Sequence, residues 1–398
     1  MTTLPDVTTP APVAELPGSP PDHRGSPIPT LAMITTRFKE LRKRRGLMIA
    51  LVLVTVGIPT VFLAIRLLLH AVDPNSYGPA GGYSVYAILT AGVLYVFGFV
   101  MAAALGATAG SIDLTEGMFR HMVVSGRSRL AIYLARIPAG LAIIGTLVAA
   151  GFTVVCLVCV FAAPTVLSYN GVDVPAGLSE AGLETWAAGH ADEVICNFDF
   201  QSGPNGPSAL VSSVMNVLPC RNGPNGGGPG PTGTPAPGTQ PTGAQISAVA
   251  SEFARFDYPA YSSQFLYPSD SLMVRTGLWL ELEAAIGFLV GLGLASLTGQ
   301  RTVTVVMMIV LEVILTPIFS RARIPHLVNL QRSVVGVATA HLEPGALGVF
   351  GGGGGGPGNG RGAPELIAES RTAAVCVVVA WLVVWTVLGA WRMMKRDA

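Results

Sequence analysis

Charge is scarce in this chain. Only 12% of its 398 residues are Asp, Glu, Lys or Arg, against roughly 25% in a typical soluble domain. Lysine occurs only at Lys39, Lys43 and Lys395. None of the three follows the glycine-rich turn of a nucleotide-binding P-loop, so the sequence predicts no ATPase in the chain itself. The glycine run at 351–356 has neither the lysine nor a preceding strand, and we interpret it as a loop.

Cysteine and histidine are also few, with five and six copies. Their spacing does not match a metal site, and no catalytic triad or carboxylate pair is visible, so we expect neither an enzyme nor a cofactor on this chain. Cys156 and Cys159 form a C-x-x-C motif inside an apolar segment, which is typical of buried membrane cysteines. Cys196 and Cys220 share a long loop, where they either form a disulfide or remain separate thiols.

Hydrophobic residues, by contrast, make up 51% of the chain, and the mean hydropathy is +0.56. They are grouped in blocks of about 20 residues or more, enough to cross a hydrocarbon core roughly 30 Å thick as a helix. We therefore predict an all-α integral membrane protein with a bundle of six transmembrane helices. The predicted helices cover residues 47–71, 83–110, 130–163, 277–297, 302–319 and 372–391.

The segment before the first of these helices combines an apolar stripe with basic residues. Leu31, Ile34, Phe38 and Leu41 recur at helical spacing, and six basic residues surround them. This pattern predicts an amphipathic helix in the lipid headgroup plane, with a solvated basic linker as the alternative. The predicted organisation is a disordered tail 1–30, an interfacial helix 31–46, three membrane helices in 47–163, a partly disordered loop 164–276, two membrane helices in 277–320, a polyglycine-containing loop 321–371, and a last helix with its tail, 372–398.

Basic residues predict the orientation in the membrane. They gather in the 37–45 cluster, in the short loops after the second and fourth helices, and at the C-terminus. The loop 164–276 holds nine acidic and three basic residues. Arginines in the loop 321–371 favour the opposite orientation, but loops of that length carry less weight. We therefore expect a multi-pass plasma-membrane protein with both termini in the cytoplasm and both long loops outside.

The loop 111–129, between the second and third helices, has features of a short amphipathic helix. Ser111 is suited to cap it, Asp113 and Glu116 suit the positive end of its dipole, and Gly126 suits its end. Its apolar residues form a stripe with Arg120 opposite. We predict a helix across the cytoplasmic end of the bundle, with an ordinary surface linker as the alternative.

This loop resembles that of the ABC-2 type permeases, the membrane subunits of many bacterial ABC exporters. The matching positions are Asp113, Glu116-Gly117, Arg120, Ser128-Arg129 and Arg136, together with the turn that ends at Arg301. The resemblance implies an exporter permease that pairs with a second copy or a homologous permease. It also implies a separate ATPase subunit that carries the ATP and Mg. The coupling residues that it implies are Asp113, Glu116, Gly117, Arg120, Arg127 and Arg129.

Three carboxylates lie within the predicted membrane helices. Glu312 is near the middle of the fifth, where a charge costs about 2.5–3.5 kcal/mol on insertion scales. Glu281 and Glu283 lie nearer the outer end of the fourth. These residues belong either to a translocation path or dimer interface, or to a structural hydrogen bond between helices. Trp279 and Trp391 are expected as anchors at opposite membrane faces.

Small residues at four-residue spacing predict close contact between helices. The four glycines with this spacing are Gly106, Gly110, Gly287 and Gly291.

Two other functions fit the sequence besides an ATP-driven permease. A proton-coupled secondary transporter would use Glu312 as its relay, and paired broken helices would be its mark. A non-transporting sensor would use the loop 164–276 as its ectodomain.

Overall fold

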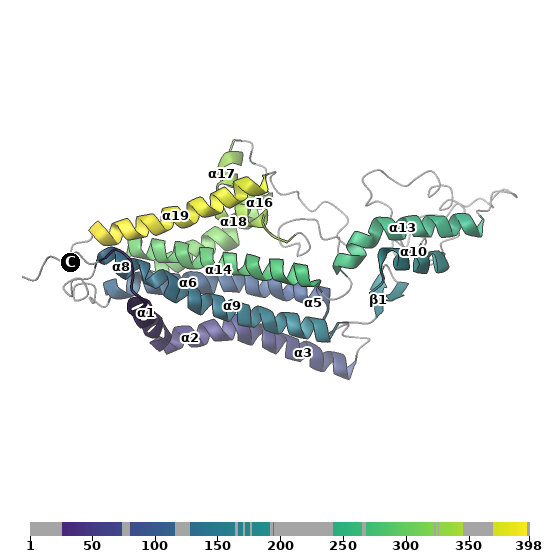
Figure 1. Cartoon of the computed structure of the whole chain (residues 1–398), viewed down its shortest axis with the longest axis horizontal. Coiled ribbons are helices and arrows are strands. Elements are labelled where there is room, and N and C mark those ends of the chain that lie inside the picture. The colour runs from purple at the N-terminus through teal and green to yellow at the C-terminus, as the bar shows by residue number, and fades with distance from the viewer. Residues whose placement is uncertain are drawn as a thin grey trace, which may run out of the picture.

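Six long apolar helices form one elongated bundle (Figure 1), so the chain is an all-α, multi-pass membrane protein with one small β-hairpin. The prediction of six membrane helices is confirmed. The computed structural model describes residues 26–73, 80–115, 128–163, 166–169, 172–175, 177–191, 194, 242–264, 268–321, 324, 326–344 and 369–395.

Each membrane-crossing helix is called a span here, and four of them consist of more than one helical element. Span 1 is α2 (Arg45–Val52), η1 (Leu53–Gly57) and α3 (Ile58–Val72); span 2 is α5 (Tyr83–Ala87), η2 (Ile88–Tyr95) and α6 (Val96–Thr115); span 3 is α8 (Arg129–Leu134) and α9 (Arg136–Phe161); span 4 is α14 (Asp270–Thr298); span 5 is α15 (Arg301–Ile309), η4 (Val310–Leu315) and α16 (Thr316–Arg321); span 6 is α19 (Arg371–Lys395).

The η elements are π-helices, and two of them have a clear cause in the sequence. η1 ends two residues before Pro59, and η4 ends two residues before Pro317. Because proline has no N–H, the carbonyl four residues earlier loses its α-helical partner. The wider hydrogen-bond pattern of a π-helix accommodates that loss.

Span 4 begins at Asp270, seven residues before the predicted start at 277. The Ser269 hydroxyl caps this end by accepting a hydrogen bond from the Leu272 N–H at 3.4 Å, and Asp270 lies in the first turn. Both features stabilise a helix N-terminus, so the helix extends beyond the purely apolar block.

Spans 2 and 4 are in close backbone contact along several helical turns. A Cβ on Gly106 would overlap the carbonyl oxygen of Phe288, and one on Gly287 would lie 2.7 Å from that of Phe99. Gly110 and Gly291 approach the facing backbone just as closely, each with a carbonyl oxygen 2.7 Å from such a Cβ. The four glycines of the predicted packing surface thus lie along one helix crossing, where only a hydrogen fits.

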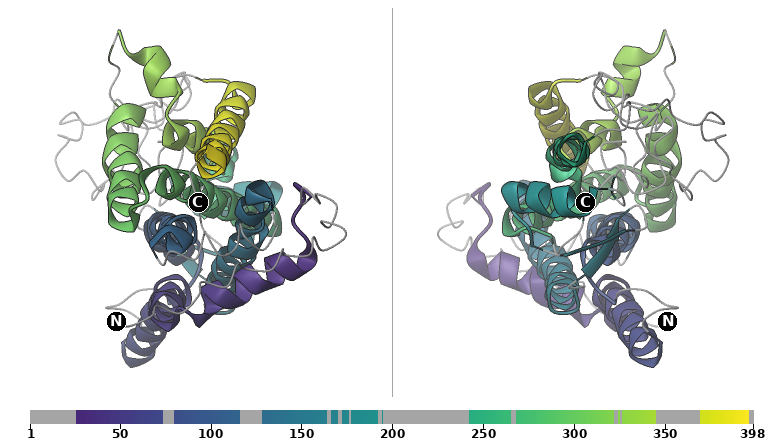
Figure 2. Two further views of the ribbon diagram at one scale, coloured as in Figure 1. Left: turned by 90° about the vertical axis from the view of Figure 1, so that its left-hand side faces the viewer. Right: turned by 90° about the vertical axis from the view of Figure 1, so that its right-hand side faces the viewer.

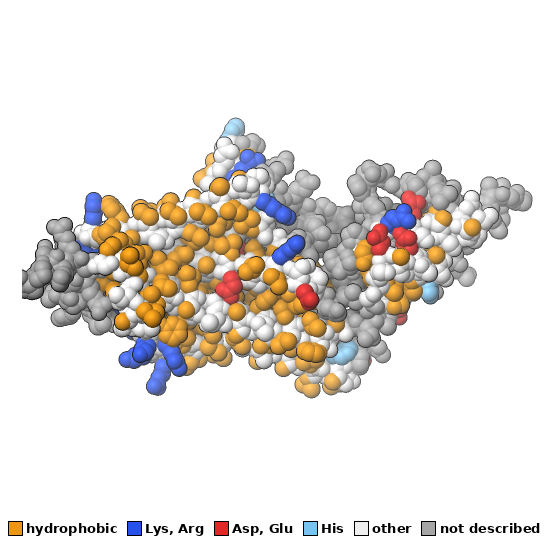
Figure 3. Space-filling model, viewed as in Figure 1, with side chains coloured by type: hydrophobic (Ala, Val, Ile, Leu, Met, Phe, Trp, Pro, Cys, Tyr) orange, Lys and Arg blue, Asp and Glu red, His pale blue; other side chains and the backbone are white. Residues whose placement is uncertain are grey.

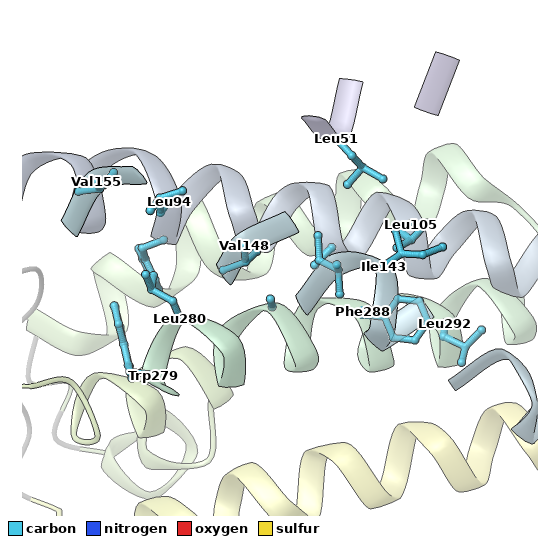
Figure 4. Close-up of a cluster of buried hydrophobic side chains, with 14 of the residues drawn as sticks. Leu51, Leu94, Leu105, Ile143, Val148, Val155, Trp279, Leu280, Phe288 and Leu292 are labelled. Carbon is cyan, nitrogen blue, oxygen red and sulfur yellow. The ribbon is translucent and has the colours of Figure 1, made fainter. Parts of the chain in front are cut away.

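The apolar core is built around span 4. Figure 4 shows Phe288 and Leu292 beside Leu105 of span 2 and Ile143 of span 3, all within one buried cluster. Span 4 buries 72% of its most apolar stretch, whereas spans 1, 5 and 6 each bury 22%. Those three spans have exposed apolar side chains along their outward faces. Figure 3 shows a broad hydrophobic surface on the side of the bundle that faces the viewer.

The two ends of the bundle differ in charge and in what covers them. Helix α1 (Leu31–Lys43) lies crosswise to the spans at one end, where it buries Arg37 and Leu41 (Figures 1 and 2). The α1–α2 junction, Arg129, Arg301 and Lys395 are at the same end, which we call the basic end.

A small module occupies the opposite end, which we call the loop end (Figure 1). Strands β1 (Val166–Tyr169) and β2 (Val172–Pro175) pair antiparallel, with Leu167 opposite Val174. Helices α10 (Glu180–Gly189) and α13 (Gly243–Gln264) pack around Leu183, and the Tyr261 hydroxyl donates to the Pro175 carbonyl at 2.6 Å. The described parts of the loop 164–276 therefore have a core of their own.

The segment between spans 5 and 6 returns to the bundle. Helices α17 (Val328–Arg332) and α18 (Val335–Ala340) lie in the predicted loop 321–371, and every residue of α18 is buried. The Trp381 indole of span 6 donates to the Ser333 carbonyl at 2.7 Å, and the Gln331 amide donates to the Phe319 carbonyl at 3.3 Å. These bonds hold α18 against spans 5 and 6. The polyglycine run lies outside the described residues.

Candidate functional site

Two of the three predicted membrane carboxylates share one buried site. Glu283 is in the middle of span 4 and is 1% exposed, while Glu312 lies in η4 of span 5 and is 4% exposed. Among the described residues, neither carboxylate is paired with Lys, Arg or His. The structure thus places Glu283 in the middle of span 4 and inside the bundle, and not nearer the outer end as predicted.

Hydroxyl groups from two spans bind Glu312. The Tyr95 hydroxyl, at the end of η2, donates to Glu312 Oε1. The Thr316 hydroxyl, at the start of α16, lies 3.4 Å from Glu312 Oε2 and also donates to the Leu311 carbonyl at 3.1 Å. Tyr95 is the last residue of the π-helix η2 and Glu312 lies in the π-helix η4, and π-helical turns are frequent at functional sites.

Trp279 forms one wall of this site. Its ring stacks on Tyr95, with the centroids 5.0 Å apart and the planes at 13°. Its indole N–H donates to the Thr339 carbonyl of α18 at 3.2 Å. Trp279 is 3% exposed and lies nine residues inside span 4, so the prediction of an anchor at the membrane face is wrong for this residue.

Helix α18 closes the site. A Cβ on Gly336 would overlap the Thr316 hydroxyl and lie 2.8 Å from Glu312 Oε2, so the α18 backbone rests directly on the carboxylate. Thr339 of α18 lies near Glu283, and its hydroxyl donates to the Gly336 carbonyl at 3.1 Å. Glu283 Oε1 has no partner among the described residues. The site therefore has acceptor capacity that the surrounding chain leaves unused.

The charged side chains that act on this site are all acidic among the residues that the structure describes. Glu312 and Glu343, which lies shortly after α18, both act electrostatically on Glu283. Two buried negative charges without a counter-ion are strongly unfavourable. The arrangement is therefore suited to share a proton between the carboxylates or to hold a small cation.

Removing the Tyr95 hydroxyl tests this geometry. Tyr95→Phe should lower the free energy of unfolding by about 1–3 kcal/mol, because Glu312 loses its main donor while remaining buried. Tyr133→Phe is the matched control, since the buried Tyr133 hydroxyl has no hydrogen-bond partner in the described part of the chain. Thermal unfolding in one detergent would compare the two variants. Equal midpoints would contradict the assigned hydrogen bond.

The third carboxylate, Glu281, faces away from this site. It lines a groove of about 390 Å³ between spans 3 and 4, with Phe152 and Gly277 among the other lining residues. A Cβ on Gly145 of span 3 would lie 2.9 Å from its Oε2. The structure thus divides the three predicted carboxylates into a buried pair and one residue at a surface groove.

The predicted coupling loop is only partly described. Asp113 is in the last turn of α6, and the Arg129 guanidinium donates to the Met394 carbonyl of span 6 at 3.0 Å. Arg136, which is 1% exposed, lies 3.4 Å from the Gly110 carbonyl. The other predicted residues, four of the coupling loop and the two loop cysteines, lie outside the described part: Glu116, Gly117, Arg120, Arg127, Cys196 and Cys220.

Tyr95, Gly336 and Thr339 belong to the site but were not predicted from the sequence. A mid-span tyrosine was a usable signal, because its hydroxyl needs a partner in hydrocarbon. Gly336 and Thr339 gave no comparable signal, since they lie in a short apolar segment of an expected loop.

No known protein family, curated protein or solved structure matches this chain.

Proposed function

We propose that the chain is the permease subunit of an ATP-binding-cassette exporter, forming the translocation path and driven by a separate ATPase subunit. The observation that carries the proposal is the arrangement of the basic end. Helix α1 lies across it, and α6 ends and α8 begins there, so both ends of the predicted coupling loop 111–129 are at the same end of the bundle as α1. An ATPase that binds this end would contact both elements.

A movement of the coupling loop on ATPase binding would be transmitted into the bundle through the contact between spans 2 and 4 at the four glycines. The last residues of α6 follow directly from Gly106 and Gly110, whose backbone rests on span 4. Span 4 carries Glu283 four residues from Gly287 of the crossing, which is about one helical turn. A shift of the coupling loop would therefore move span 4 and the buried carboxylates together.

The proposed partner can be tested at the loop. Replacing Glu116 and Arg120 together by alanine should leave the chain folded in the membrane but abolish co-purification of the ATPase, because the charges that orient the docking helix are gone. Arg392→Ala, a change at an exposed residue of the same end, is the control. Unchanged co-purification and unchanged ATP-dependent transport in the double variant would remove the coupling assignment.

The proposed orientation places the basic end in the cytoplasm, with the loop-end module outside the cell. In a cysteine-free background, Gly233→Cys should react with a membrane-impermeant maleimide on intact cells. Ala398→Cys should react only after permeabilisation. The reverse pattern would invert the topology.

A proton-coupled carrier is the second candidate, and the buried pair Glu283 and Glu312 favours it. Secondary transporters bind substrate and coupling ions between interrupted helices near the bilayer midplane. Spans 2 and 5 are interrupted by η2 and η4 next to this site. A carrier of this kind would move the proton that the pair shares.

A further inference from the structure

A cleft of about 480 Å³ opens at the basic end, away from the carboxylate site. Its walls come from three separate parts of the chain: the α1–α2 junction, the end of α6, and the start of α15. Four of its lining side chains are cationic. The lining residues are Lys43, Arg44, Arg45, Gly46, Leu47, Thr108, Ser111, Ile112 and Arg301.

The position of the cleft corresponds to the lipid headgroups. Arg45 and Arg301 are the first residues of spans 1 and 5, and Ile112 is the last residue of the apolar part of span 2. The cleft thus lies where three spans leave the hydrocarbon. Lysine and arginine side chains at this level extend their apolar stems along the helices and their charges toward the headgroups.

Within the described part of the chain, the cleft is lined by four cationic side chains and by no Asp or Glu. Arginine presents a planar fork that binds phosphate oxygens in pairs, and lysine adds a compact charge. Basic pockets between membrane helices on one side of the bilayer suit phosphorylated headgroups. We propose that this cleft binds the phosphate of an acidic phospholipid headgroup.

Binding there would fix the angle between α1 and the bundle. Arg44 has a non-helical backbone, with φ −75° and ψ 71°, and it separates α1 from α2. A phosphate held between this junction and Arg301 would connect α1 to the turn between spans 4 and 5. An acidic lipid thus acts on the position of α1, and this holds whatever the chain transports.

Native mass spectrometry of the purified full chain tests the site. The protein would be exchanged into nanodiscs of phosphatidylcholine with or without phosphatidylglycerol, and bound lipid counted after release. We expect retained phosphatidylglycerol in the wild type and at least a tenfold loss of it in Arg45→Gln/Arg301→Gln. Arg392→Gln, an exposed arginine of the same end that does not line the cleft, should match the wild type.

The cleft could equally bind free phosphate in place of a lipid headgroup phosphate, and a second experiment distinguishes the two ligands. Inorganic phosphate at millimolar concentration should not displace the lipid, whereas displacement would assign the cleft to a soluble phosphate compound. Equal lipid retention in the double variant and in Arg392→Gln would overturn the site.

Should the double variant fail to fold, crosslinking of a photoactivatable phosphatidylglycerol to the wild-type protein tests the site instead. Crosslinks must then fall on the peptides that contain Lys43–Leu47 and Arg301, and crosslinks elsewhere would overturn the proposal.

Discussion

Gly106→Ala is expected to destabilise the protein by about 3 kcal/mol, near the upper limit for one overpacked position. The added methyl would overlap the Phe288 carbonyl oxygen, which belongs to the backbone of span 4 and has no rotamer to adopt. Folded proteins have only about 5–15 kcal/mol of stability in total. We therefore expect a lower midpoint of thermal unfolding and a smaller monodisperse fraction by size-exclusion chromatography.

Gly92→Ala is the matched control for this change, because it makes the same substitution in the same span. Gly92 lies in η2, and nothing is within 4 Å of the position that its Cβ would take. Alanine is the better helix former by roughly 1 kcal/mol, so this variant should be as stable as the wild type or more so. Equal midpoints for the two variants would mean that spans 2 and 4 are not in backbone contact.

Removal of ATP is expected to abolish transport, while Glu312→Gln should retain most of it. The glutamine carbonyl can still accept the hydrogen bond from Tyr95, so the site keeps its shape without its titrating group. The measurement uses proteoliposomes that contain the chain with a co-purifying ATPase, and compares ATP hydrolysis and efflux for the two forms. The rates of ATP hydrolysis and efflux of Glu312→Gln should lie within about twofold of the wild-type rates, because the variant keeps the hydrogen bond from Tyr95.

The same proteoliposomes separate the permease from a carrier. A pH gradient imposed without ATP should persist, as read by a pH-sensitive dye trapped inside. If the wild-type protein dissipates the gradient and Glu312→Gln does not, the buried pair transfers protons. That result would reject the ATP-driven function. Glu312→Leu is the companion variant. It removes the Glu312 carboxylate that accepts from the Tyr95 hydroxyl, and it should lose stability in either case.

The six spans could be predicted from the sequence because crossing a membrane demands only a sufficient apolar length, which a sliding window measures. The close contact at Gly106 and Gly287 was also within reach, since small residues four apart lie on one helix face. Both inferences depend on neighbours within a few turns of one helix.

The carboxylate site depends on longer-range information. Tyr95 and Glu312 are 217 residues apart in sequence. Each π-helix contains one residue more than an α-helix of the same number of turns. A projection of the sequence onto a regular α-helix therefore misplaces the side chains after it by about 100°. Helix α18 has six residues, too few for a span, so hydropathy groups it with a loop. Trp279 was taken for an anchor because the predicted start of span 4 lay seven residues too late.

The π-helices also determine how spans 2 and 5 tolerate a change of length. A π-helical stretch holds more residues per unit of axial rise than an α-helix, so a codon deleted within Ile88–Tyr95 or Val310–Leu315 could leave a regular α-helix that still reaches across the bilayer. Because a π-helical turn absorbs one extra residue, such a deletion would leave the two halves of the span facing the same neighbours. The same deletion in the unbroken helix of span 4 would separate Gly287 and Gly291 from their partners in span 2.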